Sequence, residues 1–204
     1  MNTIIRQVTY GQAPPRRPDD APLIKPLALA DGRVVQFRLL TPADKPVIQA
    51  AVALLSPETS RRRFFTVRHA LSDRELDDLT NLDGWNRFAI GAYIAAPDGA
   101  TTGVGVARFV RVAESPEAAE FALIVVDAFQ GQGVGKRLLH ELVRAARERG
   151  IACLRGQVLA DNEPMLALLR NHARGRLRVT GSDPLDVSIT LDEPRGAARI
   201  IGEH

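Results

Sequence analysis

Two spacings of apolar residues run through the chain, one typical of strands and one typical of helices. Segments rich in β-branched and aromatic residues are bounded by turn residues, and the short links in the middle of the chain favour antiparallel hairpins. An earlier hairpin is predicted at Asp31-Gly32, with a second strand that ends near Leu40. The other predicted strands are residues 87–96, 101–112, 118–126, 151–159, 176–181 and 185–193.

Helix signals lie before and between these strands. Thr41, Ser56 and Ser72 each stand just before a segment with helical character, which is the position of an N-cap residue. Ser72 is followed three residues later by Glu75, as in a capping box. Longer helices are predicted at residues 133–149, where Gly150 ends the helix, and at residues 161–172.

Length and composition predict a single domain. A chain of 204 residues with 45% hydrophobic content can bury one sizeable core. We expect an alternating α/β domain over residues 23–193, between a flexible Pro- and Arg-rich tail over residues 1–22 and a C-terminal tail over residues 194–204. No apolar run is long enough to cross a bilayer, and Pro and Arg interrupt the N-terminus where a signal peptide needs apolar residues. A cytoplasmic protein without a membrane partner is therefore predicted.

Charge and cysteine content narrow the function classes. The net charge is only +3 and aromatic residues make up 5% of the chain, so neither a basic stripe nor stacking rings for nucleic acid are expected. The single cysteine, Cys153, lies in an apolar stretch, which is typical of a structural thiol. The sequence shows no clustered metal ligands, and we predict no metal cofactor.

The glycine-rich segment "QGQGVGKR" raises the question of phosphate binding. A Walker A loop would need a glycine where Gln130 stands and a Ser or Thr where Arg137 stands. A dinucleotide fingerprint would need a third glycine in place of Lys136. What remains is a glycine loop between a strand and a helix N-terminus, which suits a pyrophosphate but also describes an ordinary helix start.

The same segment carries a family resemblance. "QGQGVG" after "FALIVV" resembles the acetyl-CoA-binding motif of the GNAT superfamily of N-acetyltransferases, and the order of elements matches from about Ala28 to Leu191. "LLSPETSRRRFF", "GVGVARFVR", "AAEFALIVVDAFQGQGVGKRLL" and "LADNEPMLALLR" are similar to bacterial (Pat-like) protein lysine acetyltransferases that modify acyl-CoA synthetases. The resemblance implies a single α/β (α+β) domain whose mixed, mostly antiparallel sheet has about 6–7 strands and splays at the cofactor site, with helices on its faces.

A site for acetyl-CoA as co-substrate follows from the resemblance. The pantetheine arm would meet the strand backbone, and the pyrophosphate would meet the loop amides with Lys136 and Arg137 at the rim. Asn162 is an N-cap by its position and a weaker cofactor contact by the resemblance. The expected cofactor-binding residues are Leu123, Ile124, Val125, Gln130, Gly131, Gln132, Gly133, Val134, Gly135, Lys136, Arg137 and Asn162.

Glu120 is the candidate general base. A lysine-type amine is mostly protonated at neutral pH and must lose a proton before it can attack. Glu120 interrupts an apolar strand, so its carboxylate faces either solvent or a cleft where burial would raise its pKa. It also matches the general-base position of the similar lysine acetyltransferases. The general-acid tyrosine found in many members is replaced by Leu169, and no acid is assigned.

The early helices are expected to contact the acceptor. The candidate residues are Ser56, Thr59, Arg61 and Phe64. Capping and apolar anchoring explain the same segment, and we interpret Arg62 and Arg63 as solvated.

Three function classes stay open. The first is an N-acetyltransferase that transfers acetyl directly, within a ternary complex, to a protein lysine or a small-molecule amine. The second is a non-catalytic acyl-CoA-binding module, and the third is an adaptor that binds nucleic acid or another partner through the Arg-rich tail. A homodimer is compatible with this architecture, although no apolar stripe demands one.

Overall fold

A computed structural model describes residues 24–95, 99–173 and 176–191, which form an eight-stranded sheet in the order β1-β2-β3-β4-β5-β6-β8-β7. The strands are β1 (Leu27–Ala28), β2 (Val34–Leu39), β3 (Arg87–Ala95), β4 (Thr101–Val112), β5 (Ser115–Val125), β6 (Cys153–Val158), β7 (Leu177–Thr180) and β8 (Leu185–Thr190). The helices are α1 (Lys45–Ala53), α2 (Pro57–Phe64), α3 (Asp73–Thr80), α4 (Val134–Glu148) and α5 (Glu163–Ala173), with 3₁₀ turns η2 (Pro42–Asp44) and η3 (Asp127–Phe129).

The predicted hairpin turn and the N-caps Ser56 and Ser72 are confirmed, whereas Thr41 precedes the 3₁₀ turn η2 and α1 starts after Asp44. Gly32 adopts a φ of 85° in the hairpin between β1 and β2. Ser56 Oγ accepts the Thr59 N–H (3.1 Å) at the start of α2. Ser72 and Glu75 form the capping box of α3, where the Glu75 carboxylate accepts the Ser72 N–H (2.8 Å). These local contacts explain why short polar segments become helices.

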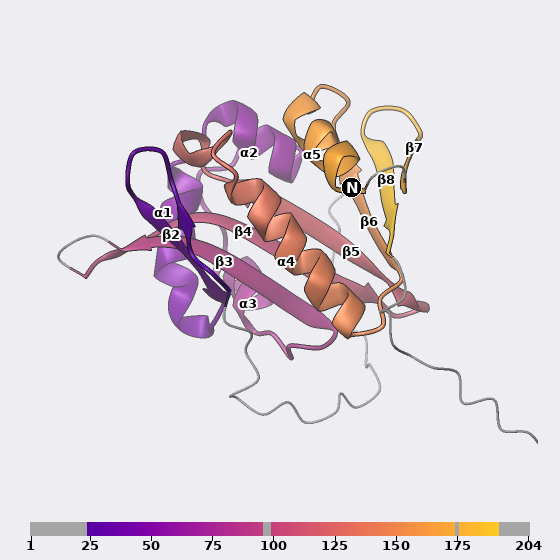
Figure 1. Ribbon diagram of the computed structural model, residues 1–204, viewed down its shortest axis with the longest axis horizontal. Coiled ribbons are helices and arrows are strands. Elements are labelled where there is room, and N and C mark those ends of the chain that lie inside the picture. The colour runs from indigo at the N-terminus through magenta and orange to yellow at the C-terminus, as the bar shows by residue number, and fades with distance from the viewer. Residues whose placement is uncertain (1–23, 96–98, 174–175, 192–204) are drawn as a thin grey trace, which may run out of the picture.

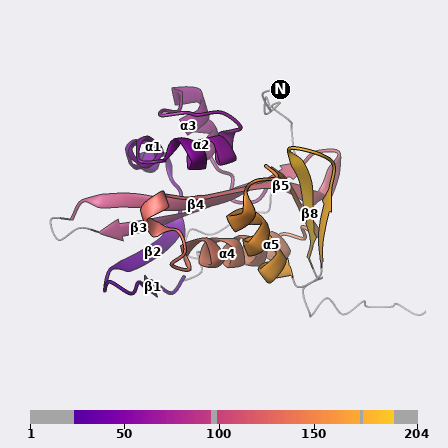
Figure 2. The same cartoon turned by 90° about the horizontal axis from the view of Figure 1, so that it is seen from above.

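Helices cover both faces of the sheet (Figure 1). Helices α1, α2 and α3 lie on one face, and α4 and α5 lie on the other (Figure 2). The central strands β3, β4 and β5 are buried between the two layers, and α4 buries Leu138, Leu139 and Leu142 against them. The predicted mixed, mostly antiparallel fold is confirmed, with eight strands instead of six to seven because the short β1 and β7 also pair.

The only parallel pairing in the described residues joins β5 to β6, and it is short. Ala118 faces Cys153 and Glu120 faces Arg155, but no later residue of β5 pairs with β6. Strand β6 continues to Val158 paired with β8, and β5 continues paired with β4 alone. The sheet therefore splays just after Glu120.

Three further predictions concern Cys153, membrane-spanning segments and the two tails. Cys153 is partly buried in β6. No helix of the described part of the chain combines the length and apolar character needed to cross a membrane. The predicted tails, residues 1–22 and 194–204, lie outside the described residues.

Candidate active site

At the splay, the backbone N–H and C=O groups of successive β5 residues point alternately toward β4 and away from it. The Val126 N–H donates to the Val104 carbonyl (2.9 Å), and hydrogen-bonded pairs alternate along an antiparallel ladder, so Ile124 also bonds to β4. The N–H and C=O groups of Leu123 and Val125 point the other way, toward the side that β6 has left. An extended ligand can bond to Leu123 and Val125, but not to the backbone of Ile124, which was also expected to bind the cofactor.

The glycine loop before α4 presents a row of backbone amides. Gly131 and Gly133 adopt φ values of 70° and 88°, which a residue with a Cβ rarely takes. The first backbone bond of α4 runs from the Arg137 N–H to the Gly133 carbonyl (3.0 Å). Among the described residues, the amides from Gly131 to Lys136 therefore have no backbone acceptor. Such a row at a helix N-terminus suits the oxygens of a phosphate group.

Gln130 shapes this loop from the inside. Its N–H donates to the Asp127 carbonyl (3.1 Å). Its side-chain Nε2 donates to the Val125 carbonyl (3.0 Å) and to Thr59 Oγ1 (3.2 Å). The Gln130 amide is thus already bonded, which differs from its expected contact with pyrophosphate.

Asp127 links the loop to helix α2. Its carboxylate accepts hydrogen bonds from the Ser56 N–H (3.0 Å), Ser56 Oγ (2.6 Å) and Thr59 Oγ1 (2.7 Å). Partial burial opposes ionisation of Asp127, but the bonds from Ser56 and Thr59 outweigh it and lower the pKa of the carboxyl. Ser56 and Thr59, expected to contact the acceptor, have their hydroxyls engaged in this link.

Helix α2 also reaches the other side of the splay. Arg61 forms an ion pair with Asp161, which follows β6, and Arg62 Nη2 donates to the Asp161 carbonyl (3.0 Å). The next residue, Asn162, is the N-cap of α5, because its Oδ1 accepts the Met165 N–H (3.2 Å). Helix α2 is therefore tied to the residues that follow both diverging strands.

The two cations at the rim of the loop differ. Lys136 is exposed, and the structure gives its ammonium no ion-pair partner among the described residues. Arg137 Nη2 donates to the Lys25 carbonyl (2.9 Å), and its Nε lies 3.3 Å from the Glu141 carboxylate. Lys136 is the better candidate for a phosphate contact.

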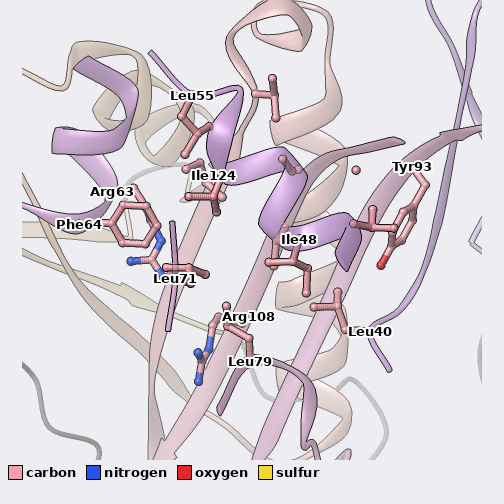
Figure 3. A pocket seen from close by; sticks show the side chains of 18 residues that line it. Leu40, Ile48, Leu55, Arg63, Phe64, Leu71, Leu79, Tyr93, Arg108 and Ile124 are labelled. Carbon is pink, nitrogen blue, oxygen red and sulfur yellow. The ribbon is translucent and has the colours of Figure 1, made fainter. Parts of the chain in front are cut away.

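A pocket of about 60 Å³ lies between the helices α1 to α3 and the sheet (Figure 3). Ala122 and Ile124 of β5 line it, and Glu120 points to the same face because side chains alternate along a strand. The Glu120 side chain is exposed and has no hydrogen-bond or ion-pair partner among the described residues. Other lining residues include Leu40, Ile48, Leu55, Arg63, Phe64, Leu71, Leu79, Tyr93 and Arg108.

The strand-loop-helix arrangement agrees with comparisons to known proteins. A family model described as the acetyltransferase (GNAT) family matches residues 54–173, from before α2 to the end of α5. The chain belongs to the GNAT acetyltransferase family. An acetyltransferase of Pseudomonas aeruginosa is 30% identical over 138 residues, which are 68% of this chain and 73% of that protein. This similarity supports an acyltransferase.

Two further GNAT relatives carry the name Pat. The acetyltransferase Pat of Mycolicibacterium smegmatis is 28% identical over 144 residues, which are 71% of this chain but only 42% of that longer protein. The crystal structure of the GNAT domain of S. lividans PAT has a TM-score of 0.70 and 26% identity, and the match covers 82% of this chain and 96% of that domain. The resemblance of the sequence to Pat-like GNAT domains is thus confirmed.

The sequence interpretation missed three residues of this candidate site. Asp127 was unassigned, although an acidic residue directly after an apolar strand is a usable signal. Arg63 was interpreted as solvated, yet it lines the pocket with Arg108. Arg108 interrupts the apolar strand "GVGVARFVRV" as Glu120 interrupts β5, so the same reasoning applied to both.

Proposed function

We propose that this GNAT enzyme transfers acetyl from acetyl-CoA directly to a primary amine, with Glu120 as the general base. The supporting observation is the position of Glu120. Its unpaired carboxylate stands at the last residue that β5 shares with β6, on the face that bears the pocket. The amide row lies beyond the other end of the same splayed segment, so donor and acceptor sites can meet there.

The residues present fit acetyl-CoA. The amides from Gly131 to Lys136 would hold the pyrophosphate. The backbone groups of Leu123 and the Val125 N–H would hold the amide-bearing pantetheine arm, because the Val125 carbonyl already accepts a bond from Gln130. When bound, acetyl-CoA supplies an acetyl group activated as a thioester. Two features support the fit over an ordinary helix start: the unbonded amides of the loop and the one-sided pairing of β5.

Glu120 would act on the acceptor. An amine with a pKa near 10.4 is protonated at neutral pH, so its nitrogen has no free electron pair for attack. The Glu120 carboxylate would take that proton, directly or through one water, and carry it as a neutral carboxylic acid. Because the carboxylate forms no ion pair in the described structure, it is available to accept a proton.

The test is acceptor-dependent release of CoA thiol, measured over a panel of small amines and a lysine-bearing acyl-CoA synthetase. Glu120→Gln should lower kcat by about 100- to 10,000-fold and leave the Kd for acetyl-CoA unchanged. Glu117→Gln is the matched control, because Glu117 is exposed on the same strand but points to the opposite face. Wild-type turnover in the Glu120→Gln enzyme would exclude Glu120 as the base.

The same assay tests the non-catalytic alternative. An acyl-CoA-binding module would bind acetyl-CoA and release no thiol with any acceptor. The similarity to the S. lividans PAT domain supports a protein lysine as acceptor, whereas the charges in the pocket support a small anionic amine.

A further inference from the structure

Within the described residues, two arginines that line the pocket have no acidic partner. Arg63 extends from α2 and Arg108 from β4, and both side chains line the pocket (Figure 3). Only 9% of Arg108 is exposed, and its Nη2 atom has no hydrogen-bond partner among the described residues. In that part of the chain, no carboxylate lies within 4.0 Å of either guanidinium group, the distance that defines an ion pair.

The positive charge of Arg63 also disfavours the protonated form of Arg108. Burial, together with the charges of Arg63 and Arg87, lowers the pKa of Arg108 to about 10, although Asp78 opposes this shift. Burial lowers the pKa of Arg63 to about 10 as well. Asp78 is already paired with Arg87 at 3.1 Å. Desolvated like charges without a counter-ion destabilise a fold, so their presence calls for a compensating anion.

Other buried arginines of this sheet region show the usual solution. Arg111, also on β4, donates to the carbonyls of Pro116 and Arg149. Arg149 in turn donates to the carbonyls of Gly84 (2.7 Å) and Ala145 (2.6 Å). Arg111 and Arg149 thus donate hydrogen bonds to backbone carbonyls within the protein, whereas the Arg108 side chain makes no hydrogen bond or ion pair among the described residues. Arg108 lies three residues before Arg111 on β4, so its side chain points to the opposite face of the sheet, where it lines the pocket.

The register places this cationic pair beside the proposed base. Arg108 faces Ala122 on β5, and Glu120 lies two residues further along the same face, roughly 7 Å away from Ala122 along the strand. We propose that Arg63 and Arg108 bind a carboxylate of the acceptor, so that the acceptor is a small apolar amino acid whose amine faces Glu120. This inference rests on the proposed acetyl transfer and names its substrate class.

Charge supports this acceptor over a protein lysine. The pocket of about 60 Å³ presents the two arginines to a carboxylate end. Its apolar walls, including Ile48, Phe64 and Ile124, suit hydrocarbon next to that end. The lysine side chain has the same charge as the two arginines, so they would oppose its entry.

The experiment compares acceptors that differ in charge alone. L-Leucine, L-methionine and L-phenylalanine are tested beside their carboxamides and a lysine peptide with blocked termini, with thiol release as readout. We expect kcat/KM for the free acids to exceed that for the carboxamides by about 10- to 100-fold, the range for a hydrogen-bonded charge pair. Equal use of acids and carboxamides, or preference for the peptide, would overturn the carboxylate site.

Variants of Arg63 and Arg108 test whether these two residues cause the preference for free acids over carboxamides. Arg63→Gln and Arg108→Gln should each raise KM for the free acid about 10-fold or more and leave the carboxamide unaffected. Arg108→Lys, which keeps the charge, should restore part of the preference. Arg74→Gln is the matched control, since Arg74 is exposed on α3 and does not line the pocket. A preference that survives in both Gln variants would contradict the assignment.

Calorimetry separates failure of this inference from failure of the proposed function. L-Leucine is titrated into the CoA-bound wild type and the CoA-bound Arg108→Gln variant. Binding that Arg108→Gln loses, without thiol release in the wild type, would refute acetyl transfer and support the carboxylate site. Thiol release with carboxamides as readily as with acids would support acetyl transfer and refute the site.

Discussion

At the scale of single residues, Arg108 and Arg111 show how one strand carries both structure and specificity. They lie three positions apart on β4 and are almost equally buried, at 9% and 8% exposed. Arg111 donates to backbone carbonyls through both Nη atoms, whereas the Arg108 side chain makes no hydrogen bond or ion pair in the described part of the chain. The first arrangement stabilises the fold, and the second leaves a charge without a counter-ion among the described residues, which the proposed carboxylate would supply.

A stability measurement distinguishes these two roles. Arg108→Met removes a desolvated charge and fills the space with apolar atoms, so the free protein should gain about 2 to 4 °C in Tm. Arg111→Met leaves the carbonyls of Pro116 and Arg149 without their donor and should lower Tm. Differential scanning calorimetry without ligand measures both. A drop in Tm for Arg108→Met similar to that for Arg111→Met would mean that Arg108 is part of the structural core.

At the scale of elements, helix α2 depends on Asp127 for its position above the splay. Three hydrogen bonds from Ser56 and Thr59 converge on this carboxylate, which therefore orders both the helix start and the loop that precedes α4. Asn in its place would keep one acceptor and turn an N–H group toward the remaining donors. Asp127→Asn should cost about 1 to 3 kcal/mol of unfolding free energy and weaken acetyl-CoA binding.

The pKa of Asp127 fixes the pH range of this effect. The pKa is lowered in the folded protein, so the stabilisation is present above the unfolded value, about 3.9, and is lost as pH falls through the folded value. Urea unfolding of wild type and Asp127→Asn should therefore differ at pH 7 and converge as the pH falls below about 4. A difference in unfolding free energy between the two proteins that stays constant as the pH falls below about 4 would exclude ionisation of the Asp127 carboxylate as its source.

The helices and strands were largely predictable from the sequence, but the separation of β5 from β6 was not. Ser56 and Ser72 predict helix starts because each caps the helix through a contact with a residue three positions later, and such a local pattern can be recognised in the sequence. The separation of β5 from β6 after Glu120 depends on pairings with residues more than thirty positions away, and only the family resemblance pointed to it. The pocket-facing position of Arg63 was equally hidden, because a charged run on a short helix has the same pattern whether it is solvated or faces a pocket.

At the scale of the whole molecule, the glycine loop should couple cofactor binding to stability. A ligand that binds only the folded state stabilises it by about 2.7 kcal/mol at a concentration of 100 times its Kd. Gly133 and Gly150 flank α4 with φ values of 88° and 70°, so alanine strains the backbone similarly at both ends. Only Gly133 belongs to the amide row, and Gly150 follows the far end of the helix.

Paired variants therefore separate folding from cofactor binding. Gly133→Ala and Gly150→Ala should each lose about 1 kcal/mol of stability without ligand, the usual cost of a Cβ at positive φ. Acetyl-CoA at saturating concentration should raise the Tm of wild type and Gly150→Ala by several degrees and raise that of Gly133→Ala much less. Thermal denaturation with and without acetyl-CoA gives both values. An equal rise in all three proteins would place the pyrophosphate somewhere other than this loop, since displacement of the Gly133 amide would then leave cofactor affinity untouched.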